Sequence, residues 1–334
     1  MAAAVLKEQG YEVIGVTLSL YKEDPATGAA DQRDAAAVCQ RLGIRHIIID
    51  RREAFEKTVI KDFINSYESG MTPNPCVLCN KAVKFSEMLS LADELGADYV
   101  ATGHYSDIRK DEKTGRYLLY RPEDKSKDQT YMLYRLTQDQ LCRILMPLAH
   151  TSKEKVRQKA KELGLSVADR PDSQDICFVP DGDYAGFIER YTEKICPEGD
   201  YVSVDGKKLG RHNGLIRYTV GQRKGLGIAL GKPAFVVEKQ PESNRVVISD
   251  NEELLYKTTV KLRDVNIIPF EFPEGEMKVK AKLRYRHKEA PATLIMKGES
   301  EAVLEFSSPQ RAPAPGQSAV FYDGEMLIGG GIII

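Results

Sequence analysis

The chain has 334 residues, enough for two or three domains, and its 42% hydrophobic and 29% charged residues are typical of a folded globular protein. A formal net charge of −1 excludes a general attraction to nucleic acid or to an anionic membrane. The sequence also excludes a membrane span, a signal peptide and a secreted disulfide scaffold, since its apolar runs are short and it has only six cysteines. We therefore expect a protein of the reducing cytoplasm that does not associate with membranes.

Helices and strands alternate along the first 195 residues. The predicted elements, in chain order, are a helix at 1–9, a strand at 11–20, a helix at 31–43, a strand at 44–50, helices at 52–68 and 79–96, a strand at 98–105 and a helix at 151–164. This order predicts a parallel sheet with helices on both faces. The chain opens with a helix that leads into a strand, whereas a parallel crossover needs a strand before that helix. Either the fold starts with a helix, or a first strand and its phosphate-facing turn are missing.

The pattern changes after residue 195. Short strands and glycine turns dominate residues 199–250, and longer strands with alternating polarity follow from residue 257. An Asp-Gly pair at 323–324 predicts a hairpin near the C-terminus. We predict an α/β domain at 1–195, a small β-rich central domain at 196–255 and a β-barrel at 256–334.

Cys76 and Cys79 lie two residues apart behind a Pro-Asn-Pro turn. The pair could bind a metal, form a redox dithiol, supply a nucleophile or simply be buried. A structural zinc site needs four ligands, but the other cysteines are scattered and no pair of histidines has ligand spacing, so no metal site is expected. A thioredoxin-type dithiol would follow the first strand of a small domain, which this pair does not.

Two interpretations of Cys79 stay open. The residue lies at the predicted start of a helix, where free N–H groups and the macrodipole favour a thiolate, and Lys81 and Lys84 add positive charge. It could equally be a small apolar helix residue. Cys177, beside Asp175, taken alone indicates a buried strand thiol. Two cysteines from distant segments that meet in one cleft would suit sulfur transfer, in which one thiol carries a persulfide and the other resolves it.

Three further groups of residues could bind ligands. Gly103 and His104 end a predicted strand at the edge of the sheet where ligands bind in open α/β folds, although a core or capping histidine is the simpler alternative. Lys127, Asp128 and Gln129 precede a predicted amphipathic helix that Asp128 could cap. One face of a further predicted strand carries Lys282, Arg284 and Arg286. This face could be solvated or could contact RNA.

Taken together, seven segments resemble the tRNA-specific 2-thiouridylase family, bacterial enzymes that thiolate the wobble uridine of tRNA. In the family's order they are NPCVLCNKAVKF, ADYVATGHY, KDQTYMLYRL, DRPDSQDICFV, HNGLIRYTVGQRKGLGI, RYRH and PGQSAVFY. The resemblance covers essentially the whole chain.

The resemblance implies an ATP-pyrophosphatase domain of the adenine nucleotide α-hydrolase type. ATP, with Mg²⁺, would adenylate the C2 oxygen of the wobble uridine in the tRNAs for Lys, Glu and Gln. A persulfide sulfur, delivered by a cysteine desulfurase or a sulfur-relay protein, would then replace that oxygen. The protein would act as a monomer with tRNA as its partner.

The resemblance also assigns roles to individual residues. Cys177 would carry the persulfide and Cys79 would be the second catalytic cysteine, which attacks or resolves through a transient disulfide. The target base would be lined by Asn74, Pro75 and Cys76, and the adenosine moiety of ATP would contact Leu18 and Gly103. The residues expected to contact tRNA are His104, Lys127, Asp128, Gln129, Arg284, Tyr285 and Gln317.

The chain departs from the family pattern in two places. Family members start with a strand and a Ser-Gly-Gly-Val-Asp-Ser loop that grips pyrophosphate, and this sequence begins just after that point. We therefore expect an N-terminally truncated chain that binds ATP poorly. Cys76 stands where some members have Asp, which leaves an acidic role at that position in doubt.

These departures leave alternatives to a complete thiolating enzyme. One is a catalytically inactive fragment that binds tRNA. A related ligase that makes an amide or guanidino product is disfavoured, because such chemistry needs no thiols. The turn-rich flanks of Cys177 lead us to expect that Cys79 and Cys177 are separated at rest until tRNA binding reorders the second segment.

Overall fold

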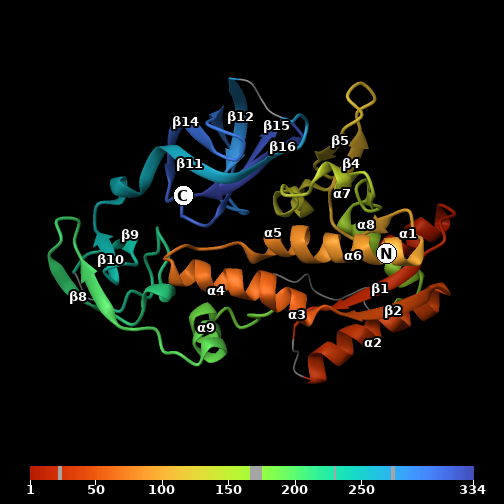
Figure 1. Ribbon diagram of the computed structural model, residues 1–334, viewed down its shortest axis with the longest axis horizontal. Coiled ribbons are helices and arrows are strands. Elements are labelled where there is room, and N and C mark those ends of the chain that lie inside the picture. Colours follow the sequence, from red (N-terminus) through yellow and green to blue (C-terminus); the bar gives the residue numbers. More distant parts are fainter. Residues whose placement is uncertain (22–24, 166–174, 229–230, 272–274) are drawn as a thin grey trace.

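The computed structural model describes residues 1–21, 25–165, 175–228, 231–271 and 275–334. Two long helices run through the middle of the molecule, with the C-terminal barrel on one side and the first strands and α2 on the other (Figure 1). The central β-rich part lies at the end of these helices that is remote from the N-terminus (Figure 1).

The first part of the chain contains α1 to α9 and β1 to β6. Its larger elements are α1 (Ala2–Glu8), β1 (Ile14–Ser19), α2 (Pro25–Leu42), β2 (Arg45–Asp50), α3 (Arg52–Phe55), α4 (Lys61–Glu68), α5 (Pro75–Cys79), α6 (Ser86–Leu95), α7 (Gln138–Leu141), α8 (Lys153–Glu162) and α9 (Tyr184–Thr192). Its shorter strands are β3 (Val100–Ala101), β4 (Asp107–Lys110), β5 (Tyr117–Tyr120) and β6 (Ile144–Leu145).

The predicted parallel pairing is confirmed. Strand β1 pairs with β2 in parallel register from Ile14 opposite Arg45 to Ser19 opposite Asp50, and β3 pairs in parallel with β6. The strand predicted at 98–105 is much shorter than expected. It ends at Ala101, after which the Thr102 hydroxyl bonds to the ring of His104 and the chain turns.

Each of the two long helices contains a π-helical segment. The first joins α3 to α4 through η1 (Glu56–Ile60), and the second joins α5 to α6 through η2 (Asn80–Phe85). The two helices lie side by side, with α5 against η1. Such segments are rare, and they often occur where a helix presents functional side chains.

The first long helix is held by an aromatic core. Phe55 and Phe63 are fully buried, and their rings meet Phe178 at centroid distances of 5.6 and 5.2 Å. Phe187 of α9 packs against the same ring at 5.2 Å. This core therefore anchors the segment after Cys177 onto the first long helix, and Cys79 of the second long helix belongs to the same core.

The rest of the chain is almost entirely β-structure. Its strands are β7 (Gly199–Val202), β8 (Lys208–His212), β9 (Phe235–Gln240), β10 (Arg245–Ser249), β11 (Tyr256–Ile267), β12 (Glu276–Lys282), β13 (Ala290–Met296), β14 (Ala302–Arg311), β15 (Ser318–Asp323) and β16 (Met326–Ile333). Strands β7 to β10 form one sheet in the order β8-β7-β10-β9.

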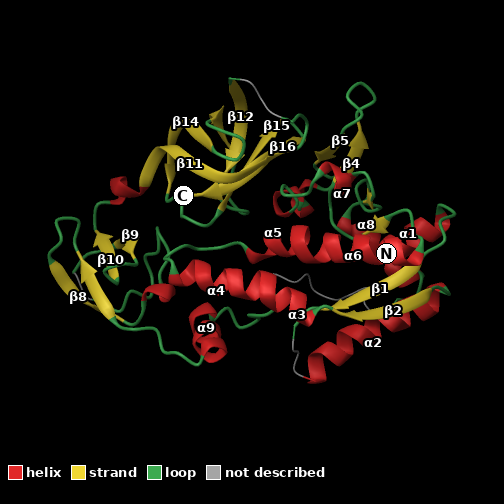
Figure 2. Ribbon diagram, viewed as in Figure 1, coloured by secondary structure: helices red, strands yellow, loops and turns green. Residues whose placement is uncertain are grey.

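Strands β11 to β16 form a closed antiparallel barrel, which confirms the predicted barrel fold (Figure 2). The order β11-β14-β13-β12-β15-β16 closes when β16 pairs with β11. The predicted Asp-Gly hairpin joins β15 to β16, with Asp323 opposite Met326. The hairpin of β4 and β5 extends this sheet, because Tyr120 pairs with Met326.

Two local predictions are wrong. The amphipathic helix expected after Gln129 is a single 3₁₀ turn, η4 (Thr130–Met132). The strand expected to carry Lys282, Arg284 and Arg286 on one face ends at Lys282, and turns follow it. Within the described residues, no helix combines the length and apolar character needed to cross a membrane.

Glycine at position 330 is required by the packing of the barrel against the α/β domain. A Cβ atom there would lie 2.6 Å from the ring of Tyr134 and 2.8 Å from the carbonyl oxygen of Ala319. We predict that Gly330→Ala lowers the free energy of unfolding by about 1–3 kcal/mol, because such a core cannot accept the extra methyl group without shifting. Urea denaturation followed by circular dichroism measures this change.

Gly298→Ala is the matched control. A Cβ atom at Gly298 would meet no atom within 4 Å, so its effect should stay within about 0.5 kcal/mol. Equal stability of both variants would contradict the packing argument.

Candidate functional site

The segment between α4 and α5 is held by both other parts of the chain. The backbone N–H of Thr72 donates to Pro315 of the barrel at 2.7 Å, and the Gln317 amide donates to the carbonyl oxygens of Thr72 and Pro73 at 2.8 and 3.4 Å. From the central sheet, Lys239 Nζ approaches the Met71 carbonyl oxygen at 3.5 Å. This segment leads directly into the helix with the paired cysteines, so three parts of the molecule position it.

The helix that carries the paired cysteines starts earlier than predicted. Asn74 is its N-cap and Pro75 its first residue, a position that suits proline because its missing N–H is not needed there. Cys79 therefore lies one turn inside the helix and not at its start. Its side chain is buried in the core that contains Val83 and Phe178.

The environment of the thiols raises their pKa values, which corrects the expected thiolate at Cys79. Desolvation is the largest cause of the raised pKa of Cys79, the neighbouring Cys177 and Cys76 add to it, and together they bring this pKa to about 12. Burial also raises the pKa of Cys76 and of Cys177. Lys84 opposes this effect, since its positive charge lowers the pKa of all three thiols.

Cys177 differs from Cys79 in access. Cys177 is exposed, whereas Cys79 is 6% exposed. Cys177 lies in a turn, and the strand expected there is absent from the described residues. Both are free thiols, and no disulfide joins them. They nevertheless lie near enough for Cys177 to influence the pKa of Cys79. The segment 166–174, just before Cys177, lies outside the described residues, and its reordering by tRNA stays a prediction.

Met132 links the predicted base-binding residues to the 3₁₀ turn η4. Asn80 Nδ2 donates to the Met132 carbonyl oxygen at 3.1 Å, and Asn74 Nδ2 lies 3.8 Å from its sulfur. Asn80 is 2% exposed, and its Oδ1 has no hydrogen-bond partner. The turn after Gln129 therefore packs on the helix at the level of the paired cysteines.

His104 and Gln129 are brought together although they are 25 positions apart. The Gln129 side chain accepts the backbone N–H of Tyr105 at 2.9 Å, and the Gln129 backbone N–H donates to the Tyr105 carbonyl oxygen at 3.0 Å. The His104 ring lies 5.8 Å from that of Phe85. Burial and the charge of Lys84 lower the pKa of His104 to about 4, so its imidazole is neutral at pH 7.

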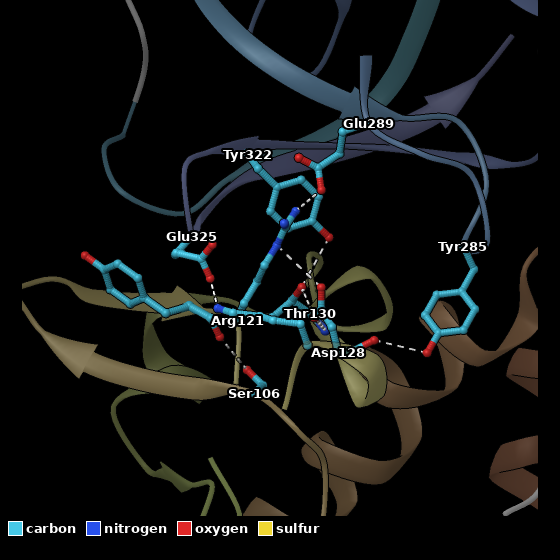
Figure 3. Close-up of polar contacts among 10 residues, drawn as sticks. Ser106, Arg121, Asp128, Thr130, Tyr285, Glu289, Tyr322 and Glu325 are labelled. Atoms are coloured by element: carbon cyan, nitrogen blue, oxygen red, sulfur yellow. Dashed lines mark hydrogen bonds and ion pairs between the residues drawn. The ribbon is translucent and has the colours of Figure 1, made fainter. Parts of the chain in front are cut away.

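Asp128 belongs to a polar network between the α/β domain and the barrel (Figure 3). Its Oδ1 accepts the backbone N–H and the hydroxyl of Thr130 at 2.9 and 2.6 Å. Its Oδ2 pairs with Arg121 at 3.4 Å, and Arg121 also pairs with Glu289 of the barrel. The Arg121 guanidinium lies over the ring of Tyr322, 4.1 Å from its centroid. The network therefore fixes Asp128 between the two domains.

Two of the predicted tRNA-binding residues also bridge domains. The Tyr285 hydroxyl donates to the Asp128 carbonyl oxygen at 3.0 Å, as Figure 3 shows, while its ring is 38% exposed. Arg284 donates to the carbonyl oxygens of Val220 and Ala312 at 3.1 and 3.0 Å. Val220 precedes the glycine-rich loop 221–227 of the central part, so Arg284 connects this loop to the barrel. Lys127 is half-buried beside this network.

The two residues expected to touch ATP lie near the carboxyl ends of parallel strands. Leu18 is the fifth residue of β1 and half-buried, and Gly103 follows β3 by two positions and is exposed. A Cβ atom at Gly103 would meet only Leu148, at an ordinary 3.7 Å. Open α/β folds bind ligands at this end of their strands.

Three family models match successive parts of the chain. They are described as the tRNA methyl transferase HUP domain over residues 1–181, the tRNA methyl transferase PRC-barrel domain over 185–250 and the aminomethyltransferase beta-barrel domain over 257–333. Curated relatives match over the whole chain. A tRNA-specific 2-thiouridylase MnmA from Clostridioides difficile is 46% identical, and this chain covers 94% of it. One from Acetivibrio thermocellus is 49% identical, with 95% covered.

The chain belongs to the tRNA-specific 2-thiouridylase family. A member from Desulfitobacterium hafniense, also 49% identical, has 94% of its length covered. The family resemblance inferred from the seven motifs is thereby confirmed, as are the HUP-type α/β domain, the central domain and the C-terminal barrel.

Several residues that build the site were missed by sequence reasoning. Arg121, Glu289 and Tyr322 lie in three separate segments, so no local spacing could have joined them. The half-buried Lys239, whose pKa desolvation lowers to about 8, occurs in a strand that otherwise looks ordinary. The early helix start had a visible signal, because an Asn-Pro pair commonly forms an N-cap and first helical residue.

Gln317 offers a direct test of the domain junction. We predict that Gln317→Met, which keeps the side chain's size but removes its donors, costs about 1 kcal/mol of stability and loosens the segment before Asn74. Faster hydrogen exchange of the Thr72 amide, measured by mass spectrometry of peptides covering 70–76, would show this loosening.

Gln310→Met is the control, because the Gln310 amide donates its hydrogen bonds to Ser308 of its own strand and not across a domain junction. Equal hydrogen exchange at Thr72 in the wild type and in Gln317→Met would contradict the role of Gln317 in holding this segment.

Proposed function

We propose that the chain catalyses formation of 2-thiouridine in tRNA. The observation that carries the proposal is that the free thiol Cys79 packs in one core with Ile176 and Phe178, the two neighbours of the free thiol Cys177, beside the Asn74-Pro75-Cys76 helix start. These thiols come from segments almost a hundred residues apart. The relatives' shared name, tRNA-specific 2-thiouridylase, supports the same chemistry.

We further propose the wobble uridine of the tRNAs for Lys, Glu and Gln as the target. Asn74, Pro75 and Cys76 would line the extruded base next to Cys79, since a base must leave its stack to reach such a site. The strand ends at Leu18 and Gly103 fit an adenosine moiety, because one offers an apolar side chain and the other an open backbone. ATP with Mg²⁺ would supply the adenylyl group that turns the C2 oxygen into a leaving group.

The two cysteines would then divide the sulfur chemistry. The terminal sulfur of a Cys177 persulfide attacks C2, a carbon–sulfur bond forms, and the C2–oxygen bond breaks as AMP departs. The Cys79 thiolate attacks the Cys177 sulfur, so a Cys79–Cys177 disulfide forms and the bond from Cys177 to the transferred sulfur breaks. The product is 2-thiouridine, and an external dithiol reductant returns the disulfide to two thiols.

The exposure of the two thiols fits this division. Cys177 is exposed, so a cysteine desulfurase or a relay protein can load it with sulfur, whereas Cys79 is protected from premature exchange by burial. We assign tRNA contacts to the residues around η4 and the barrel edge, namely His104, Lys127, Asp128, Gln129, Arg284, Tyr285 and Gln317. The protein would act as a monomer in the cytoplasm.

The proposal predicts that Cys177→Ser abolishes thiolation. The purified full chain would be incubated with unmodified tRNA, ATP, Mg²⁺, a cysteine desulfurase and cysteine, and 2-thiouridine would be measured by nucleoside mass spectrometry. The wild-type protein should form 2-thiouridine only when ATP is present.

Cys142→Ser is the matched control, since Cys142 lies in the turn after α7, where its sulfur donates a hydrogen bond to the Asp139 carbonyl oxygen. It should keep full activity. Thiolation that survives Cys177→Ser would refute the persulfide assignment.

A further inference from the structure

We propose that Lys84 is a positioning residue for sulfur transfer, whose ammonium group stabilises the anionic sulfur at Cys177 and Cys79. This inference rests on the proposed function, because it names the group that makes the two thiols reactive. It concerns a residue that neither the motif assignments nor the expected tRNA contacts include.

The need for such a group follows from the desolvation that raises the pKa values of the thiols. Sulfur exchange requires a thiolate, yet the described surroundings of Cys76, Cys79 and Cys177 disfavour negative charge. The helix start cannot compensate at Cys79, which lies a full turn inside the helix. At Cys177 the backbone N–H groups of Cys177 and Phe178 favour the thiolate, and a side-chain cation close to the sulfurs adds to this stabilisation.

The location of Lys84 suits this role. It lies in the π-helical segment η2, between two residues that pack in different directions. Val83 packs into the core shared by Cys79 and Phe178, the neighbour of Cys177. Phe85 packs against the ring of His104. Lys84 therefore lies between the Cys177 segment and the loop after β3, on the same continuous helix as Cys79.

The ammonium group of Lys84 is also available to interact with the thiols. Lys84 is half-buried, and no described residue forms a hydrogen bond or ion pair with it. Its charge lowers the pKa of each of the three thiols and of His104. A cation that is held in place without a carboxylate partner keeps its full attraction for an anion that forms during reaction.

The other titratable groups around the thiols do not supply this charge. Tyr67 of α4 and Tyr184 of α9 are neutral phenols whose pKa values burial raises. His104, whose pKa burial lowers to about 4, is neutral at pH 7. Lys81 lies one turn before Lys84, and its pKa responds to burial and to the charges of Arg135 and Asp264 instead of to the thiols.

The test is the pH dependence of alkylation in the purified full chain without tRNA. Iodoacetamide modification of the exposed Cys177 would be followed by peptide mass spectrometry between pH 6 and 11. Lys84→Met should raise the pH midpoint for Cys177 by about one unit, which lowers alkylation at pH 7 about tenfold. Lys84→Arg should restore the wild-type midpoint.

Lys84→Gln provides a second neutral variant, and Lys81→Met is the matched control from the same helix. Lys84→Gln should shift the midpoint like Lys84→Met, and Lys81→Met should leave it unchanged. The proposal is overturned if folded Lys84→Met or Lys84→Gln keeps the wild-type midpoint, or if Lys81→Met shifts it equally.

The thiolation assay separates this proposal from the proposed function. Lys84→Met should form 2-thiouridine more slowly at pH 7 and recover part of its rate at pH 9. Absence of thiolation by the wild-type protein would refute the function while leaving the alkylation result intact. An unmoved alkylation midpoint would refute the role of Lys84 even if the wild type is active.

Discussion

The placement of the site depends on main-chain hydrogen bonds to the short segment Gly70–Asn74. Thr72 is bonded on one side by Pro315 and on the other by Gln317, so the barrel grips its backbone from two directions. Gly70 and Gly316 permit this approach, because a Cβ atom at either would lie under 3.0 Å from the neighbouring domain. The segment then becomes the N-cap of the helix with Cys76 and Cys79. Correct assembly of the domains is therefore a condition for correct placement of the thiols.

This arrangement has a chemical consequence. A helix held firmly in a core places Cys79 reproducibly, but the same core removes the water that would stabilise a thiolate. Exposed Cys177 approaches from a segment that is anchored at Phe178 by the aromatic core. Backbone N–H groups favour the Cys177 thiolate, and the charge of Lys84 in η2 lowers the pKa of both sulfurs. The packed core fixes the position of Cys79, and the charge of Lys84 makes the thiols more reactive.

Local patterns predicted the elements that local packing determines. Phe55, Val59 and Phe63 repeat at helical spacing and are all buried as expected, and the predicted Asp-Gly hairpin joins β15 to β16. The failures have tertiary causes. The peptide after Gln129 turns because Asp128 is engaged by Thr130 and by Arg121, whose partner Glu289 lies far along the chain. The raised pKa of Cys79 depends on distant segments that cover it, and no window around residue 79 contains them.

The central claim is that Cys79 and Cys177, and not Cys76, exchange sulfur with each other. The most direct measurement is peptide mapping under non-reducing conditions, after turnover with tRNA, ATP and a sulfur donor but without a reductant. The account predicts that a peptide containing Cys79 becomes linked by a disulfide to one containing Cys177, in proportion to the 2-thiouridine formed. Turnover that links Cys76 to Cys177, or that proceeds with all three thiols free, would contradict it.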